Sequence, residues 1–224
     1  MSFKDCLIIS ATTTTICQFL SGSFTALKVK RMGSPGDLSP VPFLSAVVGC
    51  CLWLFYGTAI EDNTIIYTNI VGVTLNFLYV AVFLLYSSKR TGLVRQSFCA
   101  FAFLAFVVYY IESLPEPADQ KNNLGLLCVV VSLLCCASPL IALKIVIQTK
   151  STETLPFPLI LSMFLVCFQW WLYGVLIEDF YMQTTNVLGT FIALAQLSLF
   201  IIYRSSVTKG LSSPPLYTSL RSPS

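Results

Sequence analysis

The chain has 224 residues, of which 56% are hydrophobic and only 10% are Asp, Glu, Lys or Arg, with a net charge of +3. A soluble domain carries about 25% charged residues, so this composition, with a mean hydropathy of +0.80, excludes an ordinary soluble protein and indicates an integral membrane protein. A membrane-spanning helix needs about 20 mostly apolar residues, so the length allows about seven of them.

Seven apolar segments follow one another along the chain, and each is long enough or nearly long enough to span a bilayer. The first is the most polar, because "TTTT" at 12–15 interrupts it. That interruption argues against a cleaved signal peptide, so we expect the first segment to be retained. The fourth is the shortest. The predicted spans are 6–27, 42–60, 64–86, 96–111, 123–147, 156–177 and 181–203.

The basic residues between these segments predict the orientation of the chain. The side with the amino terminus holds only Lys4 and Lys121, together with eight of the ten acids. Basic loops stay in the cytoplasm, so we expect the amino terminus outside or in a lumen, the carboxyl terminus in the cytoplasm, and an odd number of spans. The other eleven Lys and Arg residues lie on the opposite side: Lys28, Lys30, Arg31, Lys89, Arg90, Arg95, Lys144, Lys150, Arg204, Lys209 and Arg221.

One stretch of sequence occurs twice. "WLFYGTAIEDNTIIYTNIVG" begins at Trp53 and "WWLYGVLIEDFYMQTTNVLG" begins at Trp170, and the shared residues are all shifted by 170 − 53 = 117 positions. Spans one to three therefore match spans five to seven, and the fourth span makes the two halves parallel, an architecture known from transporters. We predict an all-α membrane protein of 3+1+3 helices. The expected units are 5–87, a linker at 88–121, 122–204, and a disordered cytoplasmic tail at 205–224.

The repeat carries one Asn and one Trp at similar depth in each half, namely Asn69 with Trp53 and Asn186 with Trp170. Counted at 1.5 Å per helical residue, all four lie in one layer of the membrane. Taken singly, an Asn is more often a hydrogen bond between helices, and a Trp a packing or interfacial residue. The duplication favours a binding site instead, in which amides bind a neutral polyhydroxyl ligand and indoles stack on its apolar face.

Several types of residue are missing from the spans. No Asp, Glu, Lys, Arg or His lies deep in any of them, whereas ion-coupled pumps place such groups there. Passive facilitated diffusion is therefore the simplest mechanism. The chain has nine Cys, which we interpret as small packing residues, and it has no His, so we expect no metal and no cofactor. No nucleophile–base pair or phosphate-binding loop indicates an enzyme.

Prolines mark the cytoplasmic side of the predicted spans. Pro42 and Pro156 open spans two and six, whereas Pro139 lies inside span five, where a proline removes a backbone hydrogen bond and bends the helix. Such a bend is a candidate hinge for closing the inner mouth. The corresponding position in the first half is Gly22, which gives flexibility without a fixed bend.

These strings together resemble the SWEET sugar transporters over about residues 5–203. The resemblance is carried by the two repeat strings, by "SPLIALKIVIQTKST" at 138–152, and by "VPF" and "LPFP" at the openings of spans two and six. It implies that Asn69, Asn186, Trp170 and Trp53 bind the substrate. It further implies an outer gate of Tyr56 and Asp179, and an inner gate of Pro42, Pro139 and Pro156, where Gly22 departs from the family's fourth proline.

The resemblance also implies a passive, bidirectional sugar uniporter that works by alternating access without ions. Two facing indoles narrow the pocket, which favours a monosaccharide such as glucose over sucrose. The partners that the resemblance implies are a small neutral sugar, the lipid bilayer and further copies of the chain in a homo-oligomer, commonly a trimer. It implies no binding of nucleic acid. We expect the plasma membrane, with Golgi or endosomal membranes as alternatives. "YTSL" at 217–220 fits a sorting signal, although a disordered tail explains it as well.

Three rival interpretations remain. A seven-helix receptor shares the helix count but not the 117-residue repeat. An organic-solute exporter of the PQ-loop type shares the helix plan, but a proton-coupled member should keep an acid within a span. A non-transporting membrane scaffold would use the duplicated Asn for structure alone. Sugar flux in Asn69→Ala and Asn186→Ala variants separates these alternatives.

Overall fold

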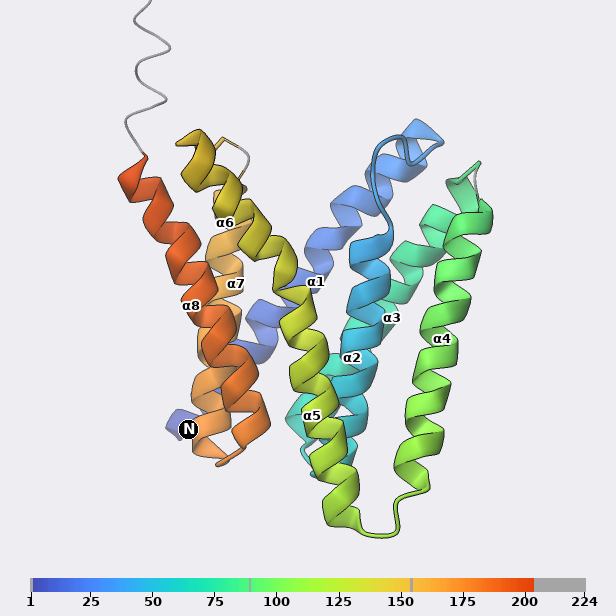
Figure 1. The fold of residues 1–224 in the computed structure, drawn as a ribbon, viewed down its shortest axis with the longest axis vertical. Coiled ribbons are helices and arrows are strands. Elements are labelled where there is room, and N and C mark those ends of the chain that lie inside the picture. The colour runs from blue at the N-terminus through green and yellow to red at the C-terminus, as the bar shows by residue number, and fades with distance from the viewer. Residues whose placement is uncertain (1, 89, 154, 204–224) are drawn as a thin grey trace, which may run out of the picture.

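The computed structural model describes residues 2–88, 90–153 and 155–203, and all the secondary structure in these ranges is helical. Seven helical segments of the described chain are long and apolar enough to cross a membrane, with α5 and α6 counted as one. This confirms the predicted all-α fold of seven spans, whereas the predicted tail at 205–224 lies outside the described residues. The helices (Figure 1) are α1 Phe3–Met32, α2 Val41–Ala59, α3 Asn63–Tyr86, α4 Arg90–Glu112, α5 Pro117–Cys135, α6 Ala137–Thr149, α7 Phe157–Leu176 and α8 Phe180–Ile202.

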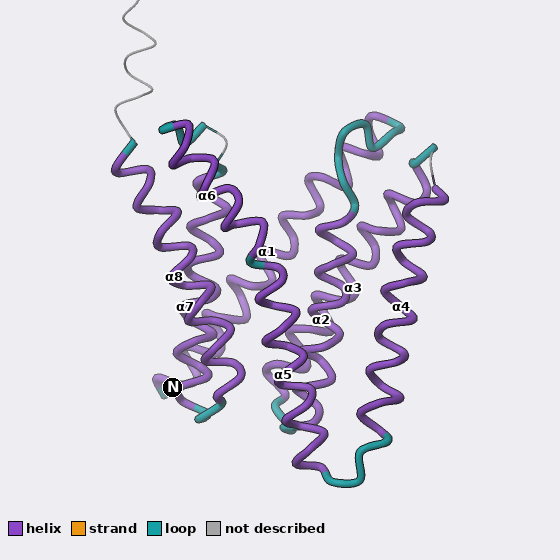
Figure 2. The backbone as a smooth tube through the Cα atoms, viewed as in Figure 1, coloured by secondary structure: helices purple, strands orange, loops and turns teal. Residues whose placement is uncertain are grey.

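The two halves share one arrangement of helices. In the first half α3 packs against both α1 and α2, and in the second half α8 packs against α5, α6 and α7. The halves meet along two interfaces, α1 with α7 and α2 with α5, and α4 packs outside the second of these (Figures 1 and 2). One interface is therefore covered by the linker helix, and the other is not.

The two interfaces differ in chemistry as well. Behind α4, the α2–α5 interface is apolar, and Leu52 and Cys128 are almost completely buried in it. The α1–α7 interface has hydrogen bonds beside its apolar contacts: the Gln169 amide donates to the Ser10 hydroxyl at 2.7 Å and accepts from the Thr14 hydroxyl at 2.6 Å. Hydrogen bonds of this kind hold membrane helices together.

The turns that join α2 to α3 and α7 to α8 have the same construction. Each contains a non-glycine residue in the left-handed region, Glu61 at φ 56° and Glu178 at φ 55°, a conformation that costs about 1–2 kcal/mol. Each next residue, Asp62 or Asp179, then caps the following helix: Asp62 Oδ1 accepts from the Thr64 amide at 2.8 Å, and Asp179 accepts from an amide in the same way. The turns thus hold one carboxylate of each half in a fixed place.

Span five, predicted as one segment, is broken in the structure. Helix α5 ends at Cys135 and α6 begins at Ala137, because Pro139 has no N–H to continue the α-helical hydrogen bonding. The Gln196 amide of α8 donates to the Pro139 carbonyl at 3.1 Å and so supports the break.

Helix α1, which holds Gly22, is continuous over 30 residues. Gly22 allows α3 to come close, because a Cβ at this position would lie 2.6 Å from the ring of Tyr79. Tyr79, which is 196 − 79 = 117 positions before Gln196, donates its hydroxyl to the Phe19 carbonyl at 3.2 Å. The third helix of each half therefore donates to the first helix from equivalent positions, although the two acceptor carbonyls are not equivalent and only one of the two first helices is broken.

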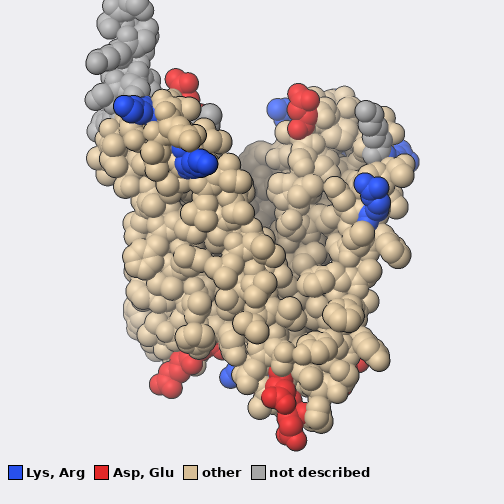
Figure 3. Space-filling view, viewed as in Figure 1, with Lys and Arg blue, Asp and Glu red and all other residues tan. Residues whose placement is uncertain are grey.

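The two ends of the molecule differ in charge and in shape. Lys and Arg gather at the end opposite the amino terminus, here called the basic end, and a hollow opens there between the two halves (Figure 3). At the amino-terminal end the halves are packed together, with Tyr56 and Tyr173 buried. The protein is thus open at the basic end and closed at the other.

Candidate functional site

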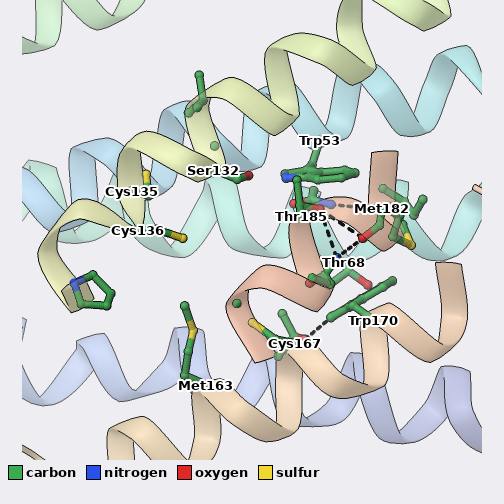
Figure 4. Close-up of a pocket in the computed structure, with 18 residues that line it drawn as sticks. Trp53, Thr68, Ser132, Cys135, Cys136, Met163, Cys167, Trp170, Met182 and Thr185 are labelled. Carbon is green, nitrogen blue, oxygen red and sulfur yellow. Dashed lines mark hydrogen bonds between the residues drawn. The ribbon is translucent and has the colours of Figure 1, made fainter. Parts of the chain in front are cut away.

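A cavity of about 280 Å³ lies between the two halves (Figure 4). The structure brings together on its wall the four residues that the repeat predicts as a site: Asn69, Asn186, Trp53 and Trp170. None of its lining residues is an Asp, Glu, Lys, Arg or His. The remaining lining residues are Thr15, Gly49, Ile65, Thr68, Val131, Ser132, Cys135, Cys136, Pro139, Met163, Cys167, Met182, Thr185 and Gly189.

The two asparagines have the same local geometry. Asn69 Nδ2 donates to the Ile65 carbonyl of α3 at 2.8 Å, and Asn186 Nδ2 donates to the Met182 carbonyl of α8 at 2.9 Å. One N–H of each amide is thereby used within its own helix. The side-chain carbonyl oxygen of each amide remains available to a ligand hydroxyl.

The two tryptophans occupy equivalent positions but differ in their contacts. Each indole ring lies edge-on to a tyrosine ring. The ring centroids are 5.6 Å apart for Trp53 and Tyr56, and 5.7 Å apart for Trp170 and Tyr173. The Trp170 indole also donates to the Thr15 hydroxyl of α1 at 2.8 Å. The structure gives Trp53 no such partner for its N–H within the described ranges.

Sequence reasoning missed several residues of the cavity wall. Thr68 and Thr185 stand directly before the two asparagines and are themselves 117 positions apart, so the repeat contained the signal. Thr15 and Ser132 are also 117 positions apart, but they lie outside the two repeat strings, and a hydroxyl residue in a span is common. Sulfur atoms of Cys135, Cys136, Cys167 and Met163 make up much of the apolar wall (Figure 4).

Two cysteines have a packing role that the repeat also contains. A Cβ on Gly72 would lie 2.7 Å from Cys50 Sγ, and a Cβ on Gly189 would lie 2.7 Å from Cys167 Sγ. In each half a thiol therefore fills the space that the glycine leaves. All nine cysteines are free thiols, as expected for packing residues within a membrane.

Two reciprocal hydrogen bonds close the amino-terminal end beside the cavity. Tyr56 of the first half donates to Asp179 of the second, and Tyr173 of the second half donates to Asp62 Oδ2 of the first at 2.6 Å. Sequence reasoning named only Tyr56 and Asp179, although both members of the second pair belong to the repeat. We call these two pairs the Tyr–Asp pairs.

The residues predicted for the inner gate are dispersed. Pro139 lines the cavity, whereas Gly22 packs against the ring of Tyr79. Pro42 lies in the first turn of α2, and Pro156 is the residue that precedes α7. Of the four, only Pro139 lies beside the predicted binding residues.

The cavity is suited to a small neutral molecule that is polar at its edges and apolar on its faces. Its amide and hydroxyl groups can exchange hydrogen bonds with such a molecule, and its indoles and sulfur atoms offer apolar surface. Within the described residues, no group of three or more His, Cys, Asp or Glu side chains could hold a metal ion.

Comparison with known proteins gives the same family for both halves. The family described as "Sugar efflux transporter for intercellular exchange" matches residues 5–91 and again residues 122–208. The chain is 37% identical over 201 residues to the sugar transporter SWEET1 of Drosophila pseudoobscura pseudoobscura, covering 89% of each chain. It is 36% identical over 196 residues to the sugar transporter SWEET1 of Caenorhabditis elegans, covering 88% of this chain and 64% of that protein.

A plant relative and a solved structure agree with these matches. The bidirectional sugar transporter SWEET7 of Arabidopsis thaliana is 30% identical over 217 residues, which cover 92% of this chain and 84% of that protein. The solved structure of a eukaryotic SWEET transporter superimposes with a TM-score of 0.81 at 25% identity, covering 92% of this chain and all of that one.

Proposed function

Because the chain belongs to the SWEET family of sugar transporters, we propose that it carries a monosaccharide, glucose first, passively and in either direction across a membrane. The observation that carries this proposal is the uncharged cavity, on which equivalent Asn and Trp side chains of both halves meet. Its volume of about 280 Å³ lies just below the usual range for ligand sites, about 300–1,000 Å³, which favours one sugar ring over two.

We propose alternating access as the mechanism, with Asn69, Asn186, Trp53 and Trp170 as the binding residues. A sugar enters from the basic end, exchanges hydrogen bonds with the two amides and lies against the indoles. The halves then close at the basic end and part at the amino-terminal end, which requires the Tyr–Asp pairs to break. With no charged group in the cavity wall, the cycle needs no ion to complete it.

We place the basic end in the cytoplasm, because basic loops stay on that side. The amino terminus is then extracellular or lumenal, and the plasma membrane is the proposed location. We keep the boundaries 5–87, 88–121 and 122–204 for the two halves and the linker. A homotrimer remains the oligomer that the family resemblance favours.

Purified protein in vesicles loaded with unlabelled glucose should take up radiolabelled glucose by counterflow, and sucrose much more slowly. Trp53→Ser should raise sucrose uptake, because it removes an indole from the wall and enlarges the cavity. Equal rates for the two sugars in the parent protein would contradict the size argument. A proton gradient should leave the glucose rate unchanged, and a rate that follows the gradient would exclude the passive mechanism.

Replacing Pro139 by alanine should slow transport several-fold without loss of folded protein. Alanine can complete the α-helical hydrogen bond that proline prevents, so the break between α5 and α6 would straighten and the hinge that we propose there would stiffen. Counterflow at saturating glucose measures the effect, with Pro117→Ala as the control. Pro117 begins α5, where a proline is tolerated, so this control should transport normally. Unchanged transport in Pro139→Ala would remove the hinge role.

A further inference from the structure

We propose that Thr15 is a positioning residue that holds the Trp170 indole as a rigid wall of the sugar site, and that Trp53 is the indole left free to turn and to donate a hydrogen bond to the sugar. This rests on the proposed function, since it assigns different tasks to the two indoles of the same cavity.

The geometry at Thr15 fixes the direction of its hydroxyl. The Thr15 hydroxyl donates to the Ala11 carbonyl, one turn earlier in α1, at 2.7 Å. With its hydrogen used there, the oxygen offers a lone pair, and Trp170 Nε1 donates to it at 2.8 Å. Thr15 is 7% and Trp170 8% exposed, so little water competes for this bond, and the ring is held at both its N–H and its edge against Tyr173.

The equivalent bond between α2 and α5 is missing. Trp53 corresponds to Trp170, and by the same shift of 117 positions Ser132 of α5 corresponds to Thr15. Figure 4 shows the Ser132 hydroxyl on the same wall as the Trp53 ring, yet the structure records no hydrogen bond between them. The cavity thus has an unused indole N–H on α2 and an unused hydroxyl on α5, whereas the equivalent groups of α7 and α1 are bonded to each other.

This asymmetry has a consequence for binding. A side chain that is already ordered loses no rotamer freedom when a ligand arrives, which raises affinity. Trp170 therefore provides a preorganised face for the sugar ring, and Trp53 adapts to it. Without the Thr15 hydroxyl, the Trp170 N–H would be buried and unsatisfied, a costly arrangement, and the ring would move to find another partner.

Fluorescence tests the positioning without any sugar. The chain has three Trp, so Trp53→Phe with Trp171→Phe leaves Trp170 as the only one. In this background Thr15→Val should shift the emission of Trp170 and lower its anisotropy, and Thr15→Ser should restore both. Thr14→Val is the matched control, because it removes the neighbouring α1–α7 bond to Gln169 at 2.6 Å but leaves Trp170 untouched. Emission that is unchanged by Thr15→Val, or changed equally by Thr14→Val, would overturn the proposal.

Glucose affinity tests the consequence in the otherwise native chain. Thr15→Val should weaken binding about tenfold, whereas Thr15→Ser and Thr14→Val should bind as the parent does. If Thr15→Ser binds glucose as weakly as Thr15→Val does, the size of the side chain matters rather than its hydroxyl group, and the proposal is overturned. If Thr15→Val does not fold, Thr15→Ala takes its place in both assays. Failure of the parent to bind any sugar would refute the proposed function, while the fluorescence would still decide whether Thr15 holds Trp170.

Discussion

Asn69→Ala and Asn186→Ala are each expected to reduce glucose counterflow at least about tenfold in protein that still folds and reaches the membrane. Each substitution removes an amide that lines the cavity, and a site built to hydrogen-bond a ligand loses much of its affinity when one partner is removed. Each substitution also removes the bond from the amide to a backbone carbonyl of its own helix. This loss should affect stability only slightly, because that carbonyl already accepts a backbone hydrogen bond within the helix. Counterflow in vesicles, with the amount of folded protein measured in parallel, gives the result.

Asn76 offers a matched control on the same helix. Its Nδ2 donates to the Gly72 carbonyl at 2.8 Å, as Asn69 Nδ2 does to Ile65 at the same distance, but Asn76 does not line the cavity. Asn76→Ala should therefore keep most of the transport. If all three variants lose transport together with folding, the amides serve structure, which is the scaffold alternative.

Opening of the amino-terminal end should become easier when a Tyr–Asp pair is broken. Tyr56→Phe and Tyr173→Phe each keep the ring but remove a hydrogen bond to a carboxylate, a bond worth about 1.5–3 kcal/mol. Each variant should therefore raise the fraction of molecules that are open at the amino-terminal end at least about tenfold. The double variant should raise this fraction further. The readout is the rate at which an impermeant maleimide, added on that side, labels Thr68→Cys in a chain whose nine native cysteines have been replaced.

The control for this experiment is a tyrosine that does not join the halves. Tyr110 of α4 donates to Asn123 of α5 at 3.1 Å, so Tyr110→Phe should leave the labelling rate unchanged. Labelling that rises equally in Tyr110→Phe would mean general loosening of the protein. If Tyr56→Phe and Tyr173→Phe both label at the parent rate, the Tyr–Asp pairs do not hold this end closed.

Much of the fold could be predicted because the membrane limits the possibilities. Low charge and apolar segments of fixed length leave only spanning helices, and the 117-residue repeat gives the parallel halves. The same repeat placed Asn69 and Asn186 at one depth, and the structure finds both on one cavity wall. Duplicated polar residues in an apolar chain are informative because each is costly unless it has a partner.

Other features could not be read from the sequence because they depend on contacts between the halves. The repeat contains both Tyr173 and Asp62, but their bond depends on the two turns lying together, and Asp62 alone looks like an ordinary helix cap. The bond from Trp170 to Thr15 joins residues 155 positions apart. The break at Cys136 was only partly predictable, since Pro139 indicates a bend but not where the helix ends.

The hydrogen bonds between α1 and α7 also bear on the order in which the protein assembles. Ser10 and Thr14 have their partner in Gln169, 159 and 155 positions later, whereas α2 and α3 are contiguous and can pair at once. During synthesis the first helix therefore enters the bilayer before its partner Gln169 exists, and until then the Thr14 hydroxyl can donate only within its own helix, to the Ser10 carbonyl at 2.9 Å. A nascent chain that stops before α7 would therefore lack the bonds that join its first helix to the second half.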